Sequence, residues 1–431
     1  MKTILFCTVG GSHQPIVTAI KDSQPDYVVF FCTDKDPGTN KPGSETQITG
    51  KGNFLKEDFK PETKPTLPNI PTQTNLTEEQ FEVVFVPADE LQVCSSVMQN
   101  TIKAHSVKHP LAELVADCTG GTKTMSTALA MKVVQIPNVS LRLVVGSRSD
   151  LKKVADGSQY QVEVNLEVLR FEPMYEKALS CWSRFGWREC IDLLEGLKPR
   201  EPQLRDRWQR ARMISKAFAA WDLFDYKSAL QTLENFNAVI AKTNPEIFSF
   251  LQSLCPKTDS EKDMAKSIPP RLWDLWLNAL RCGLNGRYDD AVARLYRLLE
   301  WSAQWQLQHK KEIKTGDLPE DIAKKYGASS NSEGRYQAGL YKAWEILENE
   351  IADSPLAQFY QKQKNKMKDQ IQKRNNSLLA HGTTPVSKTD WEEFKGWMEQ
   401  QFIPSLAEAL QEKPFKQKQY EQLPNSYIWD K

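Results

Sequence analysis

Two glycine-rich turns in the first third of the chain carry residue types that bind phosphate. One lies at residues 118–124 and the other at 10–14, and each follows an apolar run and precedes a stretch with helical character. Backbone N–H groups at the start of a helix are free to hold an anion, and glycine lets a ligand approach the backbone closely. The residues that we expect to contact a ligand are Thr8, Gly10, Gly11, Ser12, His13, Gln14, Thr119, Gly120, Gly121, Thr122, Lys123 and Thr124.

Neither turn has the spacing of a P-loop or of a G-x-G-x-x-G dinucleotide motif. The sequence therefore does not indicate an ordinary nucleoside triphosphate or dinucleotide. An isolated Gly-Gly pair more often only turns the chain. Two such turns at the carboxyl ends of strands in one sheet favour a shared ligand site.

A second group of residues suits proton transfer next to a phosphate. Arg374 and His381 are separated by six residues, and Asn375 directly follows the arginine. A guanidinium holds phosphate oxygens, and an imidazole moves protons near neutral pH, so this chemistry needs no metal. The spacing alone is weak, because a histidine near a helix C-terminus is also favourable for purely structural reasons.

Five lysines precede this pair in a segment, 362–380, that we expect to be helical. They form a basic face that fits a phosphate backbone, although a lysine run is more often a solvated helix face. The lysines are Lys362, Lys364, Lys366, Lys368 and Lys373.

The elements that position the glycine turns alternate between strand-like and helix-like segments. This alternation predicts a mostly parallel sheet flanked by helices, a Rossmann-like α/β domain over residues 1–172. Residues 34–80 hold six prolines and are longer than a crossover requires, so we expect an insertion or loop there, with a short helix near Phe54. The candidate strands are 4–9, 27–33, 81–86, 113–118, 141–146 and 161–171.

Strand signals stop after residue 171, and all 12 tryptophans lie at or after Trp182. Helical periodicity takes over, which predicts an all-α middle domain at 173–265 and an all-α C-terminal domain at 266–431. The break between them is expected within 254–270, where Pro256, Pro269 and Pro270 lie.

The composition excludes several classes of protein. The 56 basic and 55 acidic side chains of the 431 residues nearly cancel, so the net charge points to no partner. The eight cysteines have no zinc-site spacing, which favours reduced thiols, and no metal site is predicted. No apolar run approaches the roughly 20 residues of a membrane span, so we expect no membrane contact and a cytoplasmic location.

The two glycine turns resemble those of the CRISPR-associated Rossmann-fold (CARF) sensor domains. The resemblance implies that residues 10–14 and 120–124 of two subunits bind cyclic oligoadenylate, the activator, across a homodimer interface. Some relatives also cleave this ring, and the resemblance would give that role to Ser12 and Lys123.

The run from Arg374 to His381 is similar to the motif of HEPN ribonucleases, and residues 288–297 resemble a helix of the CARF-fused members. The chain therefore resembles the accessory ribonucleases of type III CRISPR systems. This implies a homodimeric endoribonuclease that cleaves single-stranded RNA without a metal or other cofactor. Its composite site would contain Arg374, Asn375 and His381, and the RNA 2′-hydroxyl would be the nucleophile. Two alternatives stay open: a cyclic-nucleotide-binding regulator or scaffold, and an N-terminal ring nuclease.

Overall fold

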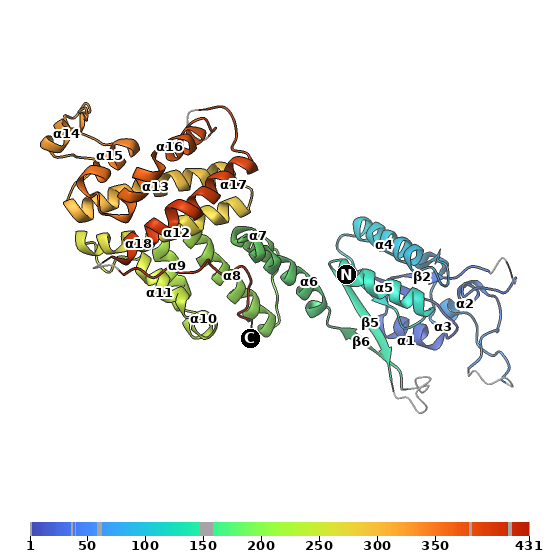
Figure 1. Ribbon diagram of the computed structural model, residues 1–431. Helices are drawn as coiled ribbons and strands as arrows, with labels where there is room; N and C mark the ends of the chain where they lie inside the picture. Colours follow the sequence, from blue (N-terminus) through green and yellow to red (C-terminus); the bar gives the residue numbers. More distant parts are fainter. Residues whose placement is uncertain are drawn as a thin grey trace. The chain divides into compact units, whose positions relative to one another are not determined.

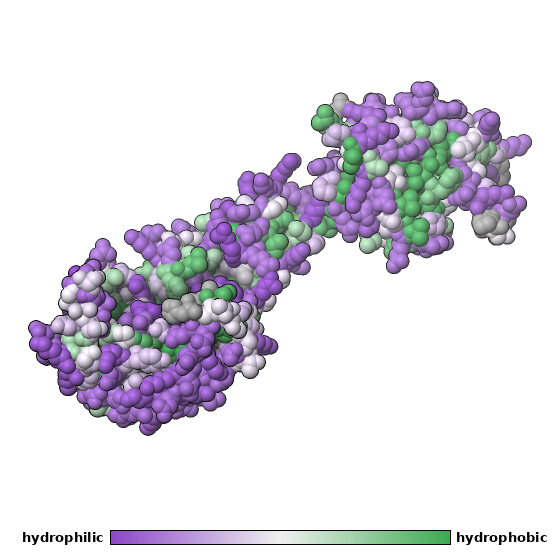
Figure 2. All heavy atoms as spheres, turned by 90° about the horizontal axis from the view of Figure 1, so that it is seen from above, coloured by the Kyte–Doolittle hydropathy of each residue, from purple (hydrophilic) through white to green (hydrophobic). Residues whose placement is uncertain are grey.

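The computed structural model describes residues 2–35, 38, 40–57, 63–146, 158–378, 382–412 and 416–430. The chain forms two compact units, Met1–Pro173 and Met174–Lys431 (Figure 1). The first contains a sheet with helices and the second contains helices, which confirms the predicted α/β and all-α order. Hydrophilic side chains cover most of the visible face of both units (Figure 2). In the described part of the chain, no helix combines the length and the apolar character that a membrane span requires.

The first unit is built on a six-stranded sheet with the order β3-β2-β1-β4-β5-β6. Neighbouring strands are parallel except for β6, which pairs antiparallel with β5. The predicted mostly parallel sheet is therefore confirmed. The strands are β1 (Thr3–Thr8), β2 (Tyr27–Cys32), β3 (Phe81–Phe85), β4 (Glu113–Asp117), β5 (Val139–Val145) and β6 (Tyr160–Val164).

Both faces of the sheet are buried, which explains why its central strands are continuous apolar runs. Ile4 and Phe6 pack on the side of α4 (Leu91–Lys108) and α5 (Lys123–Gln135). Leu5 and Cys7 point to the opposite side, where α1 (Gln14–Ser23) and buried residues of the 34–80 insertion lie (Figure 1).

Two details of the first unit differ from the sequence predictions. The expected strand at 161–171 ends at Val164, because Asn165 accepts a hydrogen bond from the Glu167 backbone (2.9 Å) where α6 (Glu167–Ser180) begins. The predicted domain boundary after residue 172 falls within α6, one residue before the end of the first unit at Pro173. The short helix expected near Phe54 is also wrong, since Leu55 pairs with Leu67 in an antiparallel bridge. The insertion instead forms α2 (Thr46–Thr49) and α3 (Ile70–Gln73).

The second unit consists of helices, with isolated β-bridges in some of the connections between them. The helices after α6 are η2 (Cys181–Arg184), α7 (Trp187–Glu195), α8 (Pro202–Asp222), α9 (Tyr226–Glu234), α10 (Asn237–Thr243), α11 (Glu246–Leu254), α12 (Glu261–Leu284), α13 (Tyr288–Lys311), α14 (Glu320–Tyr326), α15 (Leu340–Glu350), α16 (Pro355–Asn375), α17 (Lys388–Trp397), η3 (Met398–Phe402) and α18 (Ile403–Gln411).

The break expected at 254–270 is confined to residues 255–260. Helix α12 begins at Glu261, where the Ser260 hydroxyl accepts the Asp263 N–H, and it continues through Pro269 and Pro270. Both prolines are buried, so packing of α12 outweighs the hydrogen bonds that they cannot donate. The predicted boundary at 265/266 therefore lies inside this helix.

Residues 416–430, the closing segment, lie along helices that come much earlier in the sequence. Trp273 in α12 donates to the Tyr420 carbonyl (2.8 Å), and Tyr175 in α6 donates to the Asp430 carboxylate (2.7 Å). Trp429 is buried against Trp182, with ring centroids 5.4 Å apart. The segment thus contacts both α6, at the start of the helical unit, and α12, in its middle.

A buried ionic cluster lies where α8, α12 and the closing segment meet. Arg281 is fully buried and donates to Asp222 (2.8 Å), Gln422 (2.7 Å) and Asp274 (3.5 Å). Tyr226 donates to the other oxygen of Asp274 (3.0 Å). Burial raises the pKa of Asp274, and the charge of Arg281 opposes that rise.

Candidate functional site

The two glycine turns lie at the same edge of the sheet. They follow β1 and β4, which are adjacent and parallel. The chain runs from β1 through β2 to β3 on one side, and β4 and β5 lie on the other. This is the switch point at which open α/β sheets bind ligands.

The glycines are required because the two turns touch. A Cβ atom on Gly10 would lie 2.6 Å from the backbone nitrogen of Gly121, and one on Gly120 would lie 2.3 Å from the carbonyl oxygen of Thr8. Gly121 also has φ of +88°, which other residues rarely adopt. Part of the glycine pattern is thus explained by packing between the turns.

Two helix N-termini follow these turns. Helix α1 begins at Gln14 with Pro15 in its first turn, and α5 begins at Lys123. The Thr122 hydroxyl accepts the Met125 N–H (3.2 Å) and donates to the Ala88 carbonyl (2.6 Å). The partial positive charge of both helices makes this edge of the sheet favourable for an anion.

The predicted ligand residues differ in their access to solvent. Thr8 is fully buried and donates to the Gly120 carbonyl (2.6 Å), while the Thr119 hydroxyl accepts the Val144 N–H (2.8 Å). His13 is also buried. Lys123 is exposed and forms no ion pair with any described residue. Residues of the predicted set that keep accessible surface are Gly10, Gly11, Ser12, Gln14, Thr119, Gly120, Gly121, Thr122, Lys123 and Thr124.

The 34–80 insertion contacts the first turn, which the sequence did not indicate. Gln47 donates from its side chain to the Gly10 carbonyl, and Gln14 donates to the Glu57 carbonyl (2.6 Å). A cavity of about 450 Å³ lies at the ends of β2 and β3 and is lined by Asp34, Lys35 and Phe85 among others. The insertion therefore helps to hold the first turn in place.

The second candidate site centres on Arg374, near the C-terminal end of α16. Its guanidinium carbon lies 4.3 Å from the centroid of the Tyr296 ring in α13, and one of its nitrogens donates to the Asn375 amide oxygen (3.2 Å). The cation is thus oriented by a stacked aromatic ring and an adjacent amide. His381 lies outside the described residues.

The chain on either side of residues 379–381 is held close to α16. Leu378 donates to the Thr384 carbonyl (3.1 Å), and Gly382 donates to the Ser377 carbonyl (3.0 Å). Asp289 in α13 accepts the Val386 N–H (3.0 Å), which ties the returning chain to the helix that also carries Tyr296. Among the described residues, no three His, Cys, Asp or Glu side chains converge as metal ligands.

The basic face expected along α16 is partly neutralised. Lys366 and Lys373 both bind Glu393 in α17, at 2.9 and 2.6 Å, and Lys364 binds Glu348 at 3.0 Å. Lys362 and Lys368 remain exposed, with no ion pair to a described residue. Much of the lysine run therefore fastens α16 to neighbouring helices and is not free for a phosphate backbone.

These contacts make the attachment of α17 to α16 sensitive to acid. Hydrogen bonds from Lys373, Lys366 and Gln370 lower the pKa of Glu393 from its ordinary value of 4.5 to about 2. The stabilisation is therefore complete above about pH 4.5 and is lost as the pH falls through about 2. We expect Glu393→Gln to lower the free energy of unfolding by about 0.5–1 kcal/mol at pH 7, because these charges are partly exposed. Urea unfolding at pH 7 and pH 3 should show a smaller difference from the wild type at pH 3, and an equal difference would contradict the assignment.

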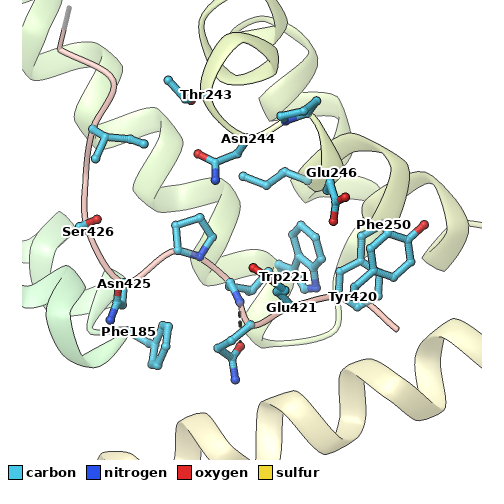
Figure 3. Close-up of a pocket in the computed structure, with 16 residues that line it drawn as sticks. Phe185, Trp221, Thr243, Asn244, Glu246, Phe250, Tyr420, Glu421, Asn425 and Ser426 are labelled. Carbon is cyan, nitrogen blue, oxygen red and sulfur yellow. Dashed lines mark hydrogen bonds between the residues drawn. The ribbon is translucent and has the colours of Figure 1, made fainter. Parts of the chain in front are cut away.

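A different cavity, of about 520 Å³, lies between α11 and the closing segment (Figure 3). Phe250 and Tyr420 stack beside it with ring centroids 4.2 Å apart. Glu246 and Glu421 line it, while no lysine or arginine does, so it is unsuited to a polyanion. It contains none of the predicted site residues.

Two family models match the helical unit. A model of the Csm6 6H domain matches residues 174–260, and a model of the Csm6 HEPN domain matches residues 261–403. Together they span more than half of the chain. The chain belongs to the Csm6 family.

A solved Csm6 structure is similar over nearly the whole length. Csm6 of Enterococcus italicus, bound to cyclic hexa-2′-fluoro-hexa-dAMP, matches with a TM-score of 0.55 and 12% sequence identity, covering 94% of this chain and 95% of that one. At this identity the likeness shows that the fold is shared. No curated protein sequence matches the chain.

The Csm6 HEPN match contains Arg374 together with Asp289 and Tyr296, two residues that sequence reasoning missed. Residues 288–297 stood out in the sequence only through a family resemblance. The helical pattern shows which side chains share a face, but it does not show which distant helix they meet. The contacts of Tyr296 with Arg374 and of Asp289 with Val386 depend on that packing.

Proposed function

We propose that this Csm6-family chain is a cytoplasmic, homodimeric endoribonuclease of CRISPR antiviral defence that cleaves single-stranded RNA without a metal. Cyclic oligoadenylate bound at the two glycine turns activates it. The orientation of Arg374 by Tyr296 and Asn375, inside the region that matches the Csm6 HEPN domain, is the observation that carries this proposal.

The chemistry follows from the types of side chain. The RNA 2′-hydroxyl loses its proton and attacks phosphorus, a 2′-O–P bond forms, and the P–O5′ bond breaks as the leaving oxygen gains a proton. Arg374 stabilises the charge on the non-bridging oxygens, Asn375 orients the guanidinium, and His381 transfers the protons. The products are a 2′,3′-cyclic phosphate and a 5′-hydroxyl.

The ligand of the first unit is inferred from the sheet edge and from the relative. Two helix N-termini and the exposed Lys123 suit a ring of phosphates, and the similar Enterococcus italicus protein was solved with a cyclic hexa-adenylate analogue. A ring contacted by two copies of the turns would favour one arrangement of the dimer. Activation then requires that this arrangement aligns both Arg374 sites.

The test is cleavage of a fluorescent single-stranded RNA in excess EDTA, with no activator, with cyclic tetra-adenylate or with cyclic hexa-adenylate. Cleavage that depends on one ring supports the proposal and identifies the ring. Ring binding without cleavage would instead favour a regulator or scaffold.

We expect Lys123→Ala to weaken binding of the activating ring about tenfold, because one charge-assisted contact to phosphate is lost. Isothermal titration calorimetry checks this. Lys132→Ala is the matched control: Lys132 lies in the last turn of the same helix, and its substitution should leave the affinity unchanged.

The same Lys123→Ala variant tests whether the protein cleaves the ring. The ring is incubated with the protein and then analysed by chromatography: a ring that disappears with the wild type and persists with Lys123→Ala would identify a ring nuclease.

We expect Tyr296→Leu to lower the rate of ring-activated RNA cleavage about tenfold, because the guanidinium of Arg374 loses the ring on which it stacks. Tyr296→Phe keeps the aromatic face and should retain most of the rate. Single-turnover cleavage at saturating ring measures both variants. Equal rates for Tyr296→Leu and the wild type would remove Tyr296 from the site.

A further inference from the structure

Helix α5 connects the second glycine turn with the first residues of α6. It begins at Lys123, in that turn, and its C-terminal end meets the side chain of Arg170 in α6. Carbonyl groups at the end of a helix lack partners within the helix and carry partial negative charge, so this cation caps α5. The guanidinium donates to four carbonyl oxygens, from Nε to Val134 (3.2 Å) and from Nη2 to Val133 (2.9 Å), Ile136 (2.9 Å) and Val139 (3.0 Å).

The start of α6 is also packed onto this end of α5. Leu166, directly before α6, is buried in the core cluster that contains Val133 and Ile136. Its carbonyl accepts the Arg170 N–H (2.9 Å), so the two side chains lie one helical turn apart. An apolar contact and a set of hydrogen bonds to a cation therefore fix the first turn of α6 to the end of α5.

Helix α6 continues from this attachment out of the first unit. That unit ends at Pro173, which has no N–H to donate to the Leu169 carbonyl, and the buried Tyr175 already belongs to the helical unit. Helix α5 has 13 residues and is about 20 Å long, so a shift of its first turn also shifts its last turn. A displacement of the second glycine turn would then reach α6 through the carbonyls that Arg170 holds.

We propose that Arg170 is a positioning residue for ring-activated cleavage: it makes the start of α6 follow α5 when a ring of phosphates binds at the second glycine turn. The inference rests on the proposed function and adds a residue through which the bound ring acts. Arg170 lies at the end of α5 opposite to the turn, so it contributes to the coupling between ring binding and cleavage and not to the contacts with the ring.

The test is Arg170→Met, which keeps an unbranched apolar stem and removes the guanidinium. Calorimetry gives its affinity for cyclic tetra-adenylate and cyclic hexa-adenylate. Single-turnover cleavage of a fluorescent single-stranded RNA gives the activation ratio, which is the rate with saturating ring divided by the rate without ring. We expect the activation ratio to fall about tenfold, while ring affinity stays equal or rises because binding no longer has to reposition α6.

Lys132→Met is the matched control. Lys132 is the cation in the last turn of α5, and its hydrogen bond to Gln135 (3.2 Å) stays within that helix. Its loss removes a favourable charge from the same helix end without loosening α6, so the activation ratio should not change. Arg170→Lys retains the charge and three donors and should recover part of the ratio.

A wild-type activation ratio in folded Arg170→Met would overturn the proposal, as would an equal fall in Lys132→Met. A fall matched by a similar loss of ring affinity would also overturn it, since that result indicates damage to the ring site. If Arg170→Met does not fold, hydrogen–deuterium exchange of the wild type decides. Ring binding should change the exchange of the α6 amides up to Glu172, and unchanged exchange would refute the coupling.

The same measurements separate this inference from the proposed function. If no ring stimulates RNA cleavage by the wild type, the activated ribonuclease is refuted, whereas a ring-dependent change in the exchange of α6 still supports transmission through α5. If a ring stimulates the wild type and Arg170→Met equally, the ribonuclease stands and only the role of Arg170 is refuted.

Discussion

Replacing Arg374 by alanine should lower ring-activated RNA cleavage by about 10²- to 10³-fold while leaving ring binding intact. The guanidinium is the cation that Tyr296 and Asn375 hold in place, and it would stabilise charge that develops only in the transition state. Its loss should therefore appear in the turnover rate more than in RNA affinity. Single-turnover cleavage at saturating RNA and saturating ring measures the effect.

Lys368→Ala is the matched control for Arg374→Ala. Lys368 is an exposed cation on the same helix and has no ion pair among the described residues, so its removal changes the net charge equally. We expect a change of no more than about twofold in turnover, since a charge far from the reacting phosphate mainly affects the rate at which RNA associates with the protein. If both variants lost activity equally, α16 would supply only a general basic surface. If neither did, the protein would be a regulator or scaffold.

Replacing Arg281 by methionine should destabilise the helical unit by about 3–5 kcal/mol. The fully buried guanidinium is the cation closest to Asp274, which is itself fully buried. Without it, Asp274 loses its ion pair while the hydrogen bond from Tyr226 remains, and either its charge stays buried or it takes up a proton. Because burial already raises the pKa of Asp274, the loss should be greater at pH 8 than at pH 5.

Urea unfolding followed by tryptophan fluorescence measures this change, since all 12 tryptophans lie in the helical unit. Arg188→Met is the control, because Arg188 is 84% exposed and, among the described residues, pairs only with Asp192 one turn away, so we expect a change below about 0.5 kcal/mol. The double variant Arg281→Met/Asp274→Leu should recover part of the loss. A single variant as stable as the wild type would mean that the cluster contributes nothing.

The sheet domain was predictable because its signals are local. Buried parallel strands are short apolar runs bounded by turn residues, and five of the six expected strands agree with the structure to within two or three residues. The meeting of the two glycine turns was also predictable, since both follow strands of one parallel sheet. The last strand was predicted to extend to residue 171, but it ends at Val164. The prediction was too long because residues 165–171, most of which belong to α6, are also partly apolar.

The contacts that build the Arg374 site and the ionic cluster were not predictable, because they join residues far apart in sequence. Arg374 and Tyr296 belong to different helices, and Arg281 meets Gln422 across 141 positions. The lysine run illustrates the same limit. Its composition indicated a phosphate-binding face, whereas the carboxylates that neutralise three of its members come from α15 and α17.

The closing segment also determines when the helical unit can finish folding during translation. Tyr175 can form its hydrogen bond only after Asp430 has been synthesised, 255 positions later. At a synthesis rate of about 5–20 residues per second this delay is roughly 13–50 s. Until then Trp182 lacks the Trp429 ring that packs against it, and Arg281 lacks Gln422. A nascent chain on the ribosome therefore exposes part of this aromatic core, and the unit that carries Arg374 becomes complete only after residue 430 has been released.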